Sequence, residues 1–386
     1  MKEKKIISLH SPNISGEEYN YIEESLSSKM LTLGKYCEIF EKKISDFTSS
    51  KYSIACVNGT SALQISLKIA GVEKNDEVIV PTLTFIAPIN AIKYNNASPI
   101  FMDVDDFHLL DINKTIKFIK NETIFKSGYT FNKKTSKKIS AIIPVHTWGN
   151  AVNLEELYLI CSERNITIIE DASESLGTTY LNGKFSNKHT GTIGLIGCLS
   201  FNANKIITSG GGGMILTDNE NIAKKARYYI NQAKDDSIWY IHNEIGYNFR
   251  LSNVHSSIGV AQLEKINDFL AKKKNIHKYY NDNFDKFKGL SIMNAPNHSN
   301  SNYWLNILNI NEEYSKNLKQ VVIDLNKKNI LVRPVWYLNH LQKPYANCQT
   351  YELENAQKIV ANSLCLPSGT DLTEDDLNCI IKYFYE

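Results

Sequence analysis

The sequence predicts an α/β fold in which a mainly parallel sheet is sandwiched by helices, with a smaller α+β domain at the C-terminus. The first observation is that short strands, apolar almost throughout, alternate with amphipathic helical segments from residue 51 to residue 172. Such strands are typical of a parallel sheet covered on both faces. The second observation is length, because 386 residues exceed the size at which one hydrophobic core stops growing. In such a fold, ligands bind at the carboxyl ends of the strands.

The expected elements of the N-terminal half begin with a helix. The stretch "SGEE" at Ser15–Glu18 is a capping box that opens a helix with Ile22 and Leu26 on its apolar side. Lysine-rich residues 112–138 interrupt the later alternation, and we expect a solvated surface insertion there rather than a phosphate-binding patch. The alternation itself predicts strands at 53–57, 77–81, 98–104, 140–149 and 166–172, with helices at 59–71, 84–96 and 153–165.

The C-terminal part begins with one long predicted helix, residues 252–284, of a length that often bridges two domains. Thr373 is the expected N-cap of the last helix. Strand-like segments lie between them, at 290–295, 303–310 and 330–336. We therefore divide the chain into a large domain (1–251), a bridging helix (252–284) and a small C-terminal domain (285–386).

Composition excludes several classes of protein. The chain has 42% hydrophobic and 22% charged residues, and its net charge of +2 gives no electrostatic basis for a nucleic-acid partner. No apolar run reaches membrane-spanning length, and the opening "MKEKKIISLHSP" lacks the apolar core of a signal peptide, so no membrane partner is expected. The seven cysteines are scattered without metal-ligand spacing, which predicts reduced thiols, a cytoplasmic location and no metal.

A candidate anion site lies in "NGTSAL", residues 58–63. A glycine and two hydroxyl residues separate a strand from the start of a helix, where free backbone N–H groups and the helix dipole favour an anion. Alone, this stretch is better explained as a plain helix N-cap.

Asp171 ends a predicted buried strand in "IIEDASES". A carboxylate in this place is costly unless it has a cationic or hydrogen-bonding partner. A helix N-cap is the alternative role. The protonated ring nitrogen of a cofactor is a better match for a buried, ionised aspartate.

Lys205 follows the apolar strand "GCLSF" and precedes four glycines, Gly210–Gly213. Desolvation at such a strand end lowers a lysine pKa and yields the neutral amine that attacks a carbonyl. The glycine run would let the backbone pass close to a ligand. Alone, Lys205 would be explained as a surface lysine. Together, the three features meet the demands of pyridoxal phosphate: backbone donors for the phosphate, an acid for the pyridine nitrogen and an amine for the aldehyde.

Five stretches of the chain resemble the sugar-nucleotide aminotransferases of the DegT/StrS type, which are fold type I pyridoxal-phosphate enzymes. They are "NGTSAL", "DEVIVPTLTFIAPINAI", "IIEDASESLG", "SFNANKIITSGGGGMILTDNE" and "IGYNFRLSNVHSSIGVAQLE". Their order and spacing match the family over nearly the whole chain.

The resemblance implies a role for each matching residue. Lys205 matches the lysine that forms an imine with the cofactor, and Asp171 matches the partner of the pyridine nitrogen. The other implied cofactor contacts are Thr60, Ser61 and Ser200 at the phosphate, Phe85 stacked on the ring, and Asn248. The asparagine of the family reaches the phosphate of the neighbouring subunit, which implies a homodimer with shared active sites. The candidates for substrate binding are His146, Arg250, Arg333, Trp336 and Leu33. A satisfied core histidine is the alternative for His146, and a structural role is the alternative for Arg250.

Glu174 departs from the family pattern, which has Gln or His at this position near the phenolic oxygen of the cofactor. An ionised glutamate would repel a phenolate, so its carboxyl must be protonated, turned away or bonded through a water. The segments "QAKDD" and "IHNEIGYNFR" are similar to the branch of the family assigned to legionaminic acid and related 4-amino sugars.

The resemblance implies transamination of a nucleotide-linked 4-keto-6-deoxy sugar by L-glutamate, in bacterial surface-glycan or nonulosonic acid biosynthesis. The expected substrate is UDP-2-acetamido-4-keto-2,4,6-trideoxyhexose, and GDP-linked or dTDP-linked analogues or a different carbonyl are alternatives. A dehydratase of this fold would replace Lys205, typically by histidine. A non-enzymatic regulator or binding module would tolerate loss of Lys205 or Asp171, so both retained residues favour the aminotransferase.

Overall fold

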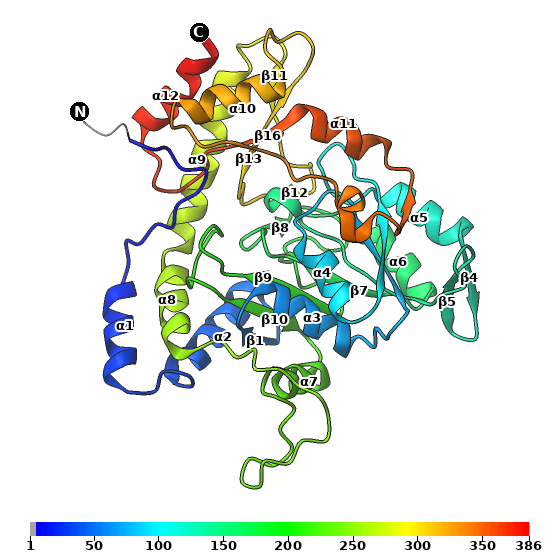
Figure 1. The fold of residues 1–386 in the computed structure, drawn as a ribbon. Helices are drawn as coiled ribbons and strands as arrows, with labels where there is room; N and C mark the ends of the chain where they lie inside the picture. The colour runs from blue at the N-terminus through cyan, green and yellow to red at the C-terminus, as the bar shows by residue number, and fades with distance from the viewer. Residues whose placement is uncertain (1–4, 386) are drawn as a thin grey trace.

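A central sheet of eight strands forms the body of the protein in a computed structural model that describes residues 5–385 (Figure 1). The strand order is β1-β10-β9-β7-β6-β2-β3-β15. In chain order these strands are β1 (Tyr52–Cys56), β2 (Glu77–Pro81), β3 (Ser98–Met102), β6 (Ile139–Ile142), β7 (Thr167–Asp171), β9 (Ile196–Ser200), β10 (Gly213–Thr217) and β15 (Gln349–Tyr351). The predicted α/β class is confirmed.

Strand direction places three chain segments at one edge of this sheet. Every neighbouring pair from β9 to β15 is parallel, whereas β10 is antiparallel to both β9 and β1. β10 is reversed because residues 201–212 return the chain without the helical crossover that a parallel neighbour requires. Since β1 therefore runs in the same direction as β7 and β9, the carboxyl ends of all three strands meet.

Helices cover both faces of the sheet, because successive apolar side chains of each strand point to opposite faces and both faces are buried. On β10, Ile215 packs toward α3 (Gly59–Ile69), α4 (Ala87–Tyr94) and α7 (Glu220–Ile230). Its neighbour Met214 points to the other face, which is covered at this end by α2 (Lys35–Thr48) and α8 (Asn253–Glu264). Farther along that second face lie α5 (Ile112–Asn121) and α6 (Glu155–Glu163).

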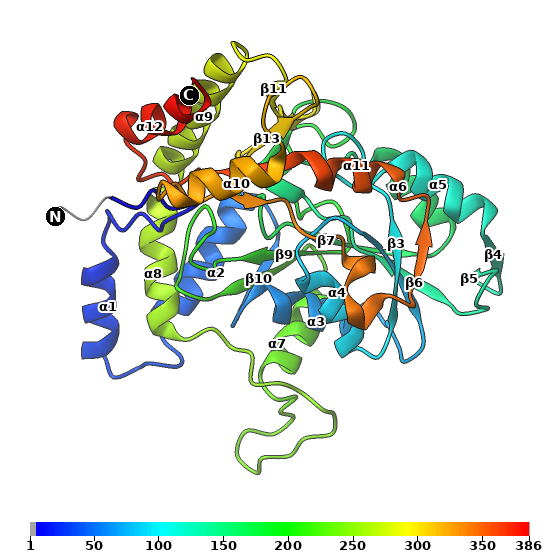
Figure 2. The same ribbon diagram turned by 45° about the horizontal axis from the view of Figure 1, so that its top comes forward.

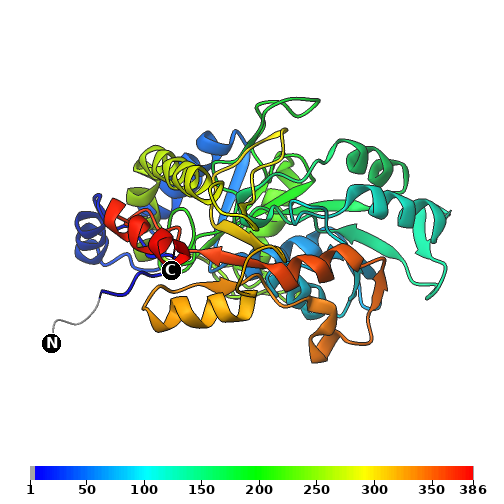
Figure 3. The ribbon, with the colours of Figure 1, turned by 90° about the horizontal axis from the view of Figure 1, so that it is seen from above.

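A second sheet of four strands forms the core of the C-terminal part, in the order β11-β13-β16-β14. Its strands are β11 (Leu290–Ile292), β13 (Asn306–Ile310), β14 (Arg333–Pro334) and β16 (Ser363–Leu366). Its helices are α9 (Ile266–Phe284), α10 (Leu318–Lys327) and α12 (Glu374–Tyr385), and α12 lies against α9 (Figure 3). Thr373 caps α12 as predicted, because its hydroxyl accepts the backbone N–H of Asp376 at 3.2 Å.

The division into residues 1–251, 252–284 and 285–386 remains a prediction, and its outer limits, residues 1 and 386, lie outside the described part of the chain. Three pairings connect its proposed units, one of them between β8 (Thr179–Tyr180) and β12 (Ser299–Asn300). β15 extends the large sheet by pairing in parallel with β3, and Ile7 of the N-terminal segment forms a bridge with Ile330. α11 (Glu354–Asn362) follows β15 and leads back to β16.

Three sequence-based expectations are corrected by the structure. α1 (Glu18–Ser27) begins at Glu18 without a side-chain cap, because the Glu18 carboxylate accepts the Gly16 N–H instead, at 2.8 Å. Leu26 of this helix is 54% exposed rather than on a buried face, since α1 turns Glu18 and Ser25 toward the protein. The single helix expected at 252–284 is two helices, α8 and α9, with Lys265 between them (Figure 1).

Residues 112–138 are likewise not the purely solvated insertion that the sequence predicts. They form α5 and a hairpin of β4 (Thr123–Lys126) and β5 (Tyr129–Asn132). Phe118 and Ile119 of α5 are fully buried in the core, which explains why this segment belongs to the fold. Across the residues that the structure describes, no helix is both long and apolar enough to span a membrane.

Candidate functional site

A cavity of about 300 Å³ lies where the carboxyl ends of β1, β7 and β9 meet. It is the place at which an α/β fold is expected to bind its ligand. Its walls are formed by Asn58, Gly59, Thr60, Phe85, Ala87, Asp171, Ser173, Glu174, Ser200, Asn202, Asn204, Lys205, Trp304 and Trp336. The structure thus brings together seven of the residues predicted from the sequence: Thr60, Phe85, Asp171, Glu174, Ser200, Lys205 and Trp336.

The amino end of α3 forms one end of the cavity. Asn58 caps this helix, because its side-chain oxygen accepts the Ser61 N–H at 2.8 Å. The cap leaves the first N–H groups of the helix for a ligand, together with the Thr60 hydroxyl. Gly59 is required here, since a Cβ atom on it would lie 2.9 Å from Cβ of Ser200.

Asp171 ends β7 and is 4% exposed. Its Oδ1 accepts the Ser173 N–H at 3.1 Å. Burial raises the pKa of Asp171, while the Ser173 contacts and the charge of Lys205 oppose the rise. A cationic partner inside the cavity would restore the ionised form, as expected of a carboxylate that faces a protonated ring nitrogen.

Lys205 lies on the loop after β9, with its side chain only 13% exposed. Nζ is 3.9 Å from Oε1 of Glu174 and 4.1 Å from the ring centroid of Trp304. Burial lowers the pKa of Lys205, and the charges of Glu174 and Asp171 oppose this effect. The neutral amine predicted for this residue is therefore accessible at a milder pH than for a surface lysine.

Glu174 is 5% exposed and is anchored by the backbone of Trp148, whose N–H donates to Oε2 at 2.9 Å. Burial raises its pKa to about 7, against the opposing charge of Lys205. Of the three states left open by the sequence, the protonated one is thus well populated near neutral pH.

Phe85, Trp304 and Trp336 are the aromatic residues of the cavity wall, and Trp148 packs against the two tryptophans without lining the cavity. The rings of Trp148 and Trp336 are stacked, with centroids 4.0 Å apart, and Trp304 lies 6.2 Å from Trp148. Phe85 is 53% exposed and lies 6.3 Å from Trp336. A half-exposed phenyl ring at the mouth of a cavity offers an apolar face to a planar ligand.

These residues fit the predicted cofactor, pyridoxal phosphate. The open amino end of α3 suits the phosphate, the buried Asp171 suits the ring nitrogen, and the free face of Phe85 suits the ring. Lys205 supplies the amine within the same cavity. Within residues 5–385, no group of three or more His, Cys, Asp or Glu side chains is arranged to hold a metal ion.

The glycine run has a different purpose from the one predicted. None of Gly210–Gly213 lines the cavity. A Cβ atom on Gly213 would lie 2.4 Å from the carbonyl carbon of Asn58, so this glycine lets β10 approach the loop that precedes α3. Gly210 has a φ of +78°, which an L-residue rarely adopts. The run therefore supports the loop that precedes α3, and its glycines do not line the cavity.

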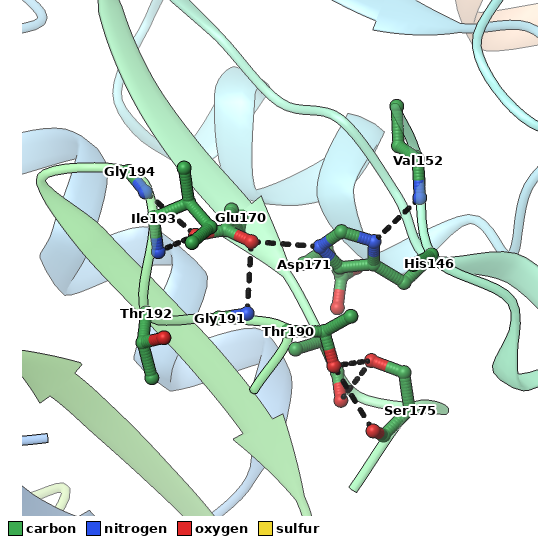
Figure 4. A network of polar contacts seen from close by, with 12 residues as sticks. His146, Val152, Glu170, Asp171, Ser175, Thr190, Gly191, Thr192, Ile193 and Gly194 are labelled. Carbon is green, nitrogen blue, oxygen red and sulfur yellow. Dashed lines mark hydrogen bonds and ion pairs between the residues drawn. The ribbon is translucent and has the colours of Figure 1, made fainter. Parts of the chain in front are cut away.

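His146 does not line the cavity and is fully buried (Figure 4). Its Nδ1 accepts the Val152 N–H at 3.0 Å, so Nε2 carries the proton and donates to Oε2 of Glu170 at 2.9 Å. With both ring nitrogens satisfied, it has the geometry of the core histidine that the sequence left open. Glu170 also accepts the N–H groups of Gly191, Ile193 and Gly194, at 2.6–2.8 Å.

Five further predicted site residues lie outside the cavity. Ser61 is buried behind it, with its N–H bound to Asn58. Leu33 and Arg250 line a separate hollow of about 340 Å³, and the buried Nε of Arg250 has no partner there. Arg333 is exposed on β14 and donates to Asn326 and to the carbonyl of Val332. Asn248 is exposed in the segment between α7 and α8, which projects from the body of the protein (Figure 2).

Two aromatic residues of the site were missed from the sequence: Trp304 in the cavity wall, and Trp148, which stacks on Trp336. Trp304 lies 99 positions after Lys205, and its Nε1 donates to the carbonyl of Asn204 at 2.6 Å. Nothing in the local pattern of a buried strand indicates such a contact. Trp148 has a left-handed backbone (φ 60°, ψ 8°), which is unusual for a bulky residue and is not visible in the letters "HTWG".

Comparison with known proteins identifies the family of the chain. The model of the DegT/DnrJ/EryC1/StrS aminotransferase family matches residues 12–384. The GDP-perosamine synthase of Escherichia coli O157:H7 is 34% identical over 385 residues, covering 99% of this chain and 98% of the relative.

Solved structures share the whole fold. The Helicobacter pylori aminotransferase PseC, involved in the biosynthesis of pseudaminic acid, has a TM-score of 0.88 at 23% identity, covering 99% of this chain and 98% of its own. An E. coli GDP-4-keto-6-deoxy-D-mannose-3-dehydratase with bound hydrated pyridoxal phosphate has a TM-score of 0.85 at 24% identity, covering 98% of this chain and all of its own. The architecture is therefore that of a fold type I aminotransferase.

Proposed function

We propose that this chain, which belongs to the DegT/DnrJ/EryC1/StrS aminotransferase family, converts a nucleotide-linked 4-keto-6-deoxy sugar into the 4-amino sugar. L-glutamate is the amino donor, and pyridoxal phosphate is the cofactor. One observation carries the proposal: the buried amine of Lys205, the carboxylate of Asp171 and the open amino end of α3 share one cavity.

Binding of the cofactor is assigned to groups with matching chemistry. The amino end of α3, with Thr60 and Ser200, holds the phosphate, and Asp171 faces the ring nitrogen. Phe85 covers one face of the ring. When bound, the cofactor supplies an electron sink for the carbon atom that loses its proton.

Lys205 moves the protons of the reaction. Its amine takes the proton from Cα of glutamate in the first half-reaction and delivers one to C4 of the sugar in the second. Burial favours this role because it lowers the lysine pKa, and it keeps the moving proton away from bulk water. The retained lysine also distinguishes the chain from the dehydratase alternative.

The proposed substrate is UDP-2-acetamido-4-keto-2,4,6-trideoxyhexose, in surface-glycan or legionaminic-type nonulosonic acid biosynthesis. The name of the H. pylori structure, an aminotransferase of pseudaminic acid biosynthesis, supports a related pathway. A GDP-linked 4-keto-6-deoxy sugar is the second candidate, since a relative that matches almost the full chain is a GDP-perosamine synthase. Trp336 is a proposed wall for the sugar, because it lines the cavity beside Phe85.

We also propose a homodimer in the cytoplasm, with sites shared between subunits. The segment between α7 and α8, which carries Asn248, projects from the body and exposes Ile238, Trp239 and Ile245 by 75–80% (Figures 1 and 2). Apolar side chains so exposed are typical of an interface. All seven cysteines are free thiols, as expected in a reducing compartment.

A panel of nucleotide sugars tests the substrate. The purified, cofactor-loaded protein is mixed with glutamate, which should bleach its visible absorption, and then with UDP-, GDP- or dTDP-linked 4-keto-6-deoxy sugars. The UDP-linked N-acetyl sugar should restore the absorption and yield a 4-amino product by mass spectrometry. Bleaching without restoration by any of these sugars would overturn the sugar assignment while leaving the aminotransferase intact.

A further inference from the structure

We propose that Glu174 is the proton partner of Lys205: its carboxyl group takes up the proton that the lysine ammonium must lose to become a base, and later returns it. The inference rests on the proposed role of Lys205 as the base, but it does not depend on which sugar is the substrate. It adds to the cavity a second residue that handles protons.

The first argument is geometric. Oε1 of Glu174 is 3.9 Å from Nζ of Lys205, and the two side chains are 4% and 13% exposed. This separation is longer than a hydrogen bond, so transfer requires a rotation of the flexible lysine stem or one bridging water. Both groups face the same cavity, where bulk solvent cannot easily exchange the proton.

The second argument is that Glu174 is held in place. Its Oε2 accepts the Trp148 N–H at 2.9 Å, which leaves Oε1 as the oxygen nearer the lysine. Trp148 is itself fixed, because its Nε1 donates to Nδ1 of His108 at 3.1 Å and its ring is stacked on Trp336. Its left-handed backbone aims the N–H at the carboxylate and is maintained by this packing.

The third argument is that burial moves the pKa values of the two groups toward each other. Burial raises the pKa of Glu174 to about 7 and lowers the pKa of Lys205, while the attraction between the two charges opposes both shifts. One N–H bond breaks and one O–H bond forms, so an ammonium and a carboxylate become an amine and a carboxylic acid. The net charge of the pair does not change, which makes the transfer inexpensive in a dry cavity.

Four other titratable groups lie near the pair: Asp171, His10, Lys273 and Cys365. Asp171 is the second carboxylate that acts on Lys205, and it is assigned to the cofactor. Burial lowers the pKa of His10, which interacts with both Lys205 and Lys273, so this imidazole is neutral. Burial also lowers the pKa of Lys273, to about 7, and raises that of the Cys365 thiol, which remains protonated.

The test measures the protonation of Lys205 directly. The full-length protein is loaded with pyridoxamine phosphate, which carries its own amine and leaves Lys205 free. Acetylation of the Lys205 peptide by acetic anhydride is followed by mass spectrometry across a pH series. Wild type is compared with Glu174→Gln, which still accepts the Trp148 N–H, and with Glu174→Asp, which keeps the charge. Lys114, whose ion-pair partners are Asp103 and Glu354, is the internal control.

Loss of the carboxylate should move the labelling midpoint of Lys205 about one pH unit lower in Glu174→Gln, because a negative charge stabilises the ammonium. Glu174→Asp should stay closer to wild type, and Lys114 should not move. An unchanged midpoint in Glu174→Gln would overturn the inference, and so would equal shifts in both variants, since these would report packing rather than charge. If Glu174→Gln does not fold, the Asp variant alone still decides, because a shift as large as one unit with the charge retained contradicts the proposal. Failure of sugar turnover would not affect any of these outcomes.

Discussion

The Nζ atom of Lys205 lies 4.1 Å from the centroid of the Trp304 indole ring, which lines the cavity together with Trp336. The indole stabilises the ammonium through its negative face, and its Nε1 holds the lysine loop at the carbonyl of Asn204. A single side chain from the C-terminal part of the fold thus positions the proposed base, although it contributes no proton.

Replacement of Trp304 by leucine should therefore disturb the base more than substrate binding. We expect kcat for the glutamate half-reaction to fall by roughly tenfold, the effect of a small misplacement of a reacting group, with little change in KM. Single-turnover absorbance measurements check this. Tyr158→Leu, on the surface of α6, is the control and should behave like wild type. A change in KM alone would indicate a substrate contact instead.

Two glycines in the same run should respond differently to alanine. In Gly213→Ala the new Cβ would lie 2.4 Å from the Asn58 carbonyl carbon, and neither backbone can move without displacing the start of α3. We expect a loss of about 1–3 kcal/mol in unfolding free energy and roughly tenfold weaker cofactor binding. Gly211→Ala is the matched control, because the nearest atom to its Cβ is 3.9 Å away. Equal effects in the two variants would contradict the explanation given for the glycine run.

Glu170 should stabilise the fold only while it is ionised. Its burial raises its pKa, but the bond from His146 and the backbone N–H groups outweigh this, so the net pKa lies below the ordinary value of 4.5. A carboxylate with a lowered pKa contributes its full stability above the unfolded pKa and loses it as the pH falls through the folded one. Glu170→Gln should cost about 3 kcal/mol near neutral pH, because an amide leaves N–H donors unsatisfied.

Chemical denaturation at several pH values checks this prediction. The difference in unfolding free energy between wild type and Glu170→Gln should be constant above pH 5, which is about half a unit above the ordinary pKa of 4.5. At more acid pH this difference should become smaller. A difference that does not depend on pH would show that shape rather than charge is responsible.

For Lys273 we also expect stability to rise with pH, but in a more alkaline range than for Glu170. It is fully buried and donates to the carbonyls of Trp304, at 2.9 Å, and Ser368, and burial lowers its pKa from 10.5 to about 7. Between these two values the unfolded chain binds more protons than the folded one, so stability rises with pH by about 1.4 kcal/mol per unit. Lys273→Met should lack this contribution. Parallel stability profiles of the two proteins from pH 7 to 10 would contradict the lowered pKa.

The sequence predicts the parts of the fold that depend on local pattern. Apolar strands and amphipathic helices locate most of the central sheet, and Thr373 caps its helix because a capping hydrogen bond spans only a few residues. The break between α8 and α9 at Lys265 has no glycine or proline to mark it, so the apolar pattern reads as continuous. The exposure of Leu26 could not be predicted from its polarity. An apolar residue remains exposed when its helix turns another face toward the protein.

The residues of the candidate site also fall into two groups, those that the local sequence pattern predicts and those that it does not. Asp171 and Lys205 follow strands that share an edge of the sheet, so strand order alone brings them together. Trp304 reaches the cavity, and Trp148 stacks on the wall residue Trp336, through tertiary packing across the chain, which no local motif encodes. His146 lies four residues beyond the end of β6, not in the strand expected at 140–149, and the direction of its side chain depends on Glu170, the residue directly before Asp171.

Reduction of the enzyme by borohydride tests the central claim most directly. The full-length protein is loaded with pyridoxal phosphate, reduced and digested, and the peptide that carries the cofactor is identified by mass spectrometry. We predict one modified site, Lys205, and no modification in Lys205→Ala, although that variant should still bind pyridoxamine phosphate. A cofactor attached to another lysine in the wild-type protein, with Lys205 unmodified, would contradict the assignment of the cavity.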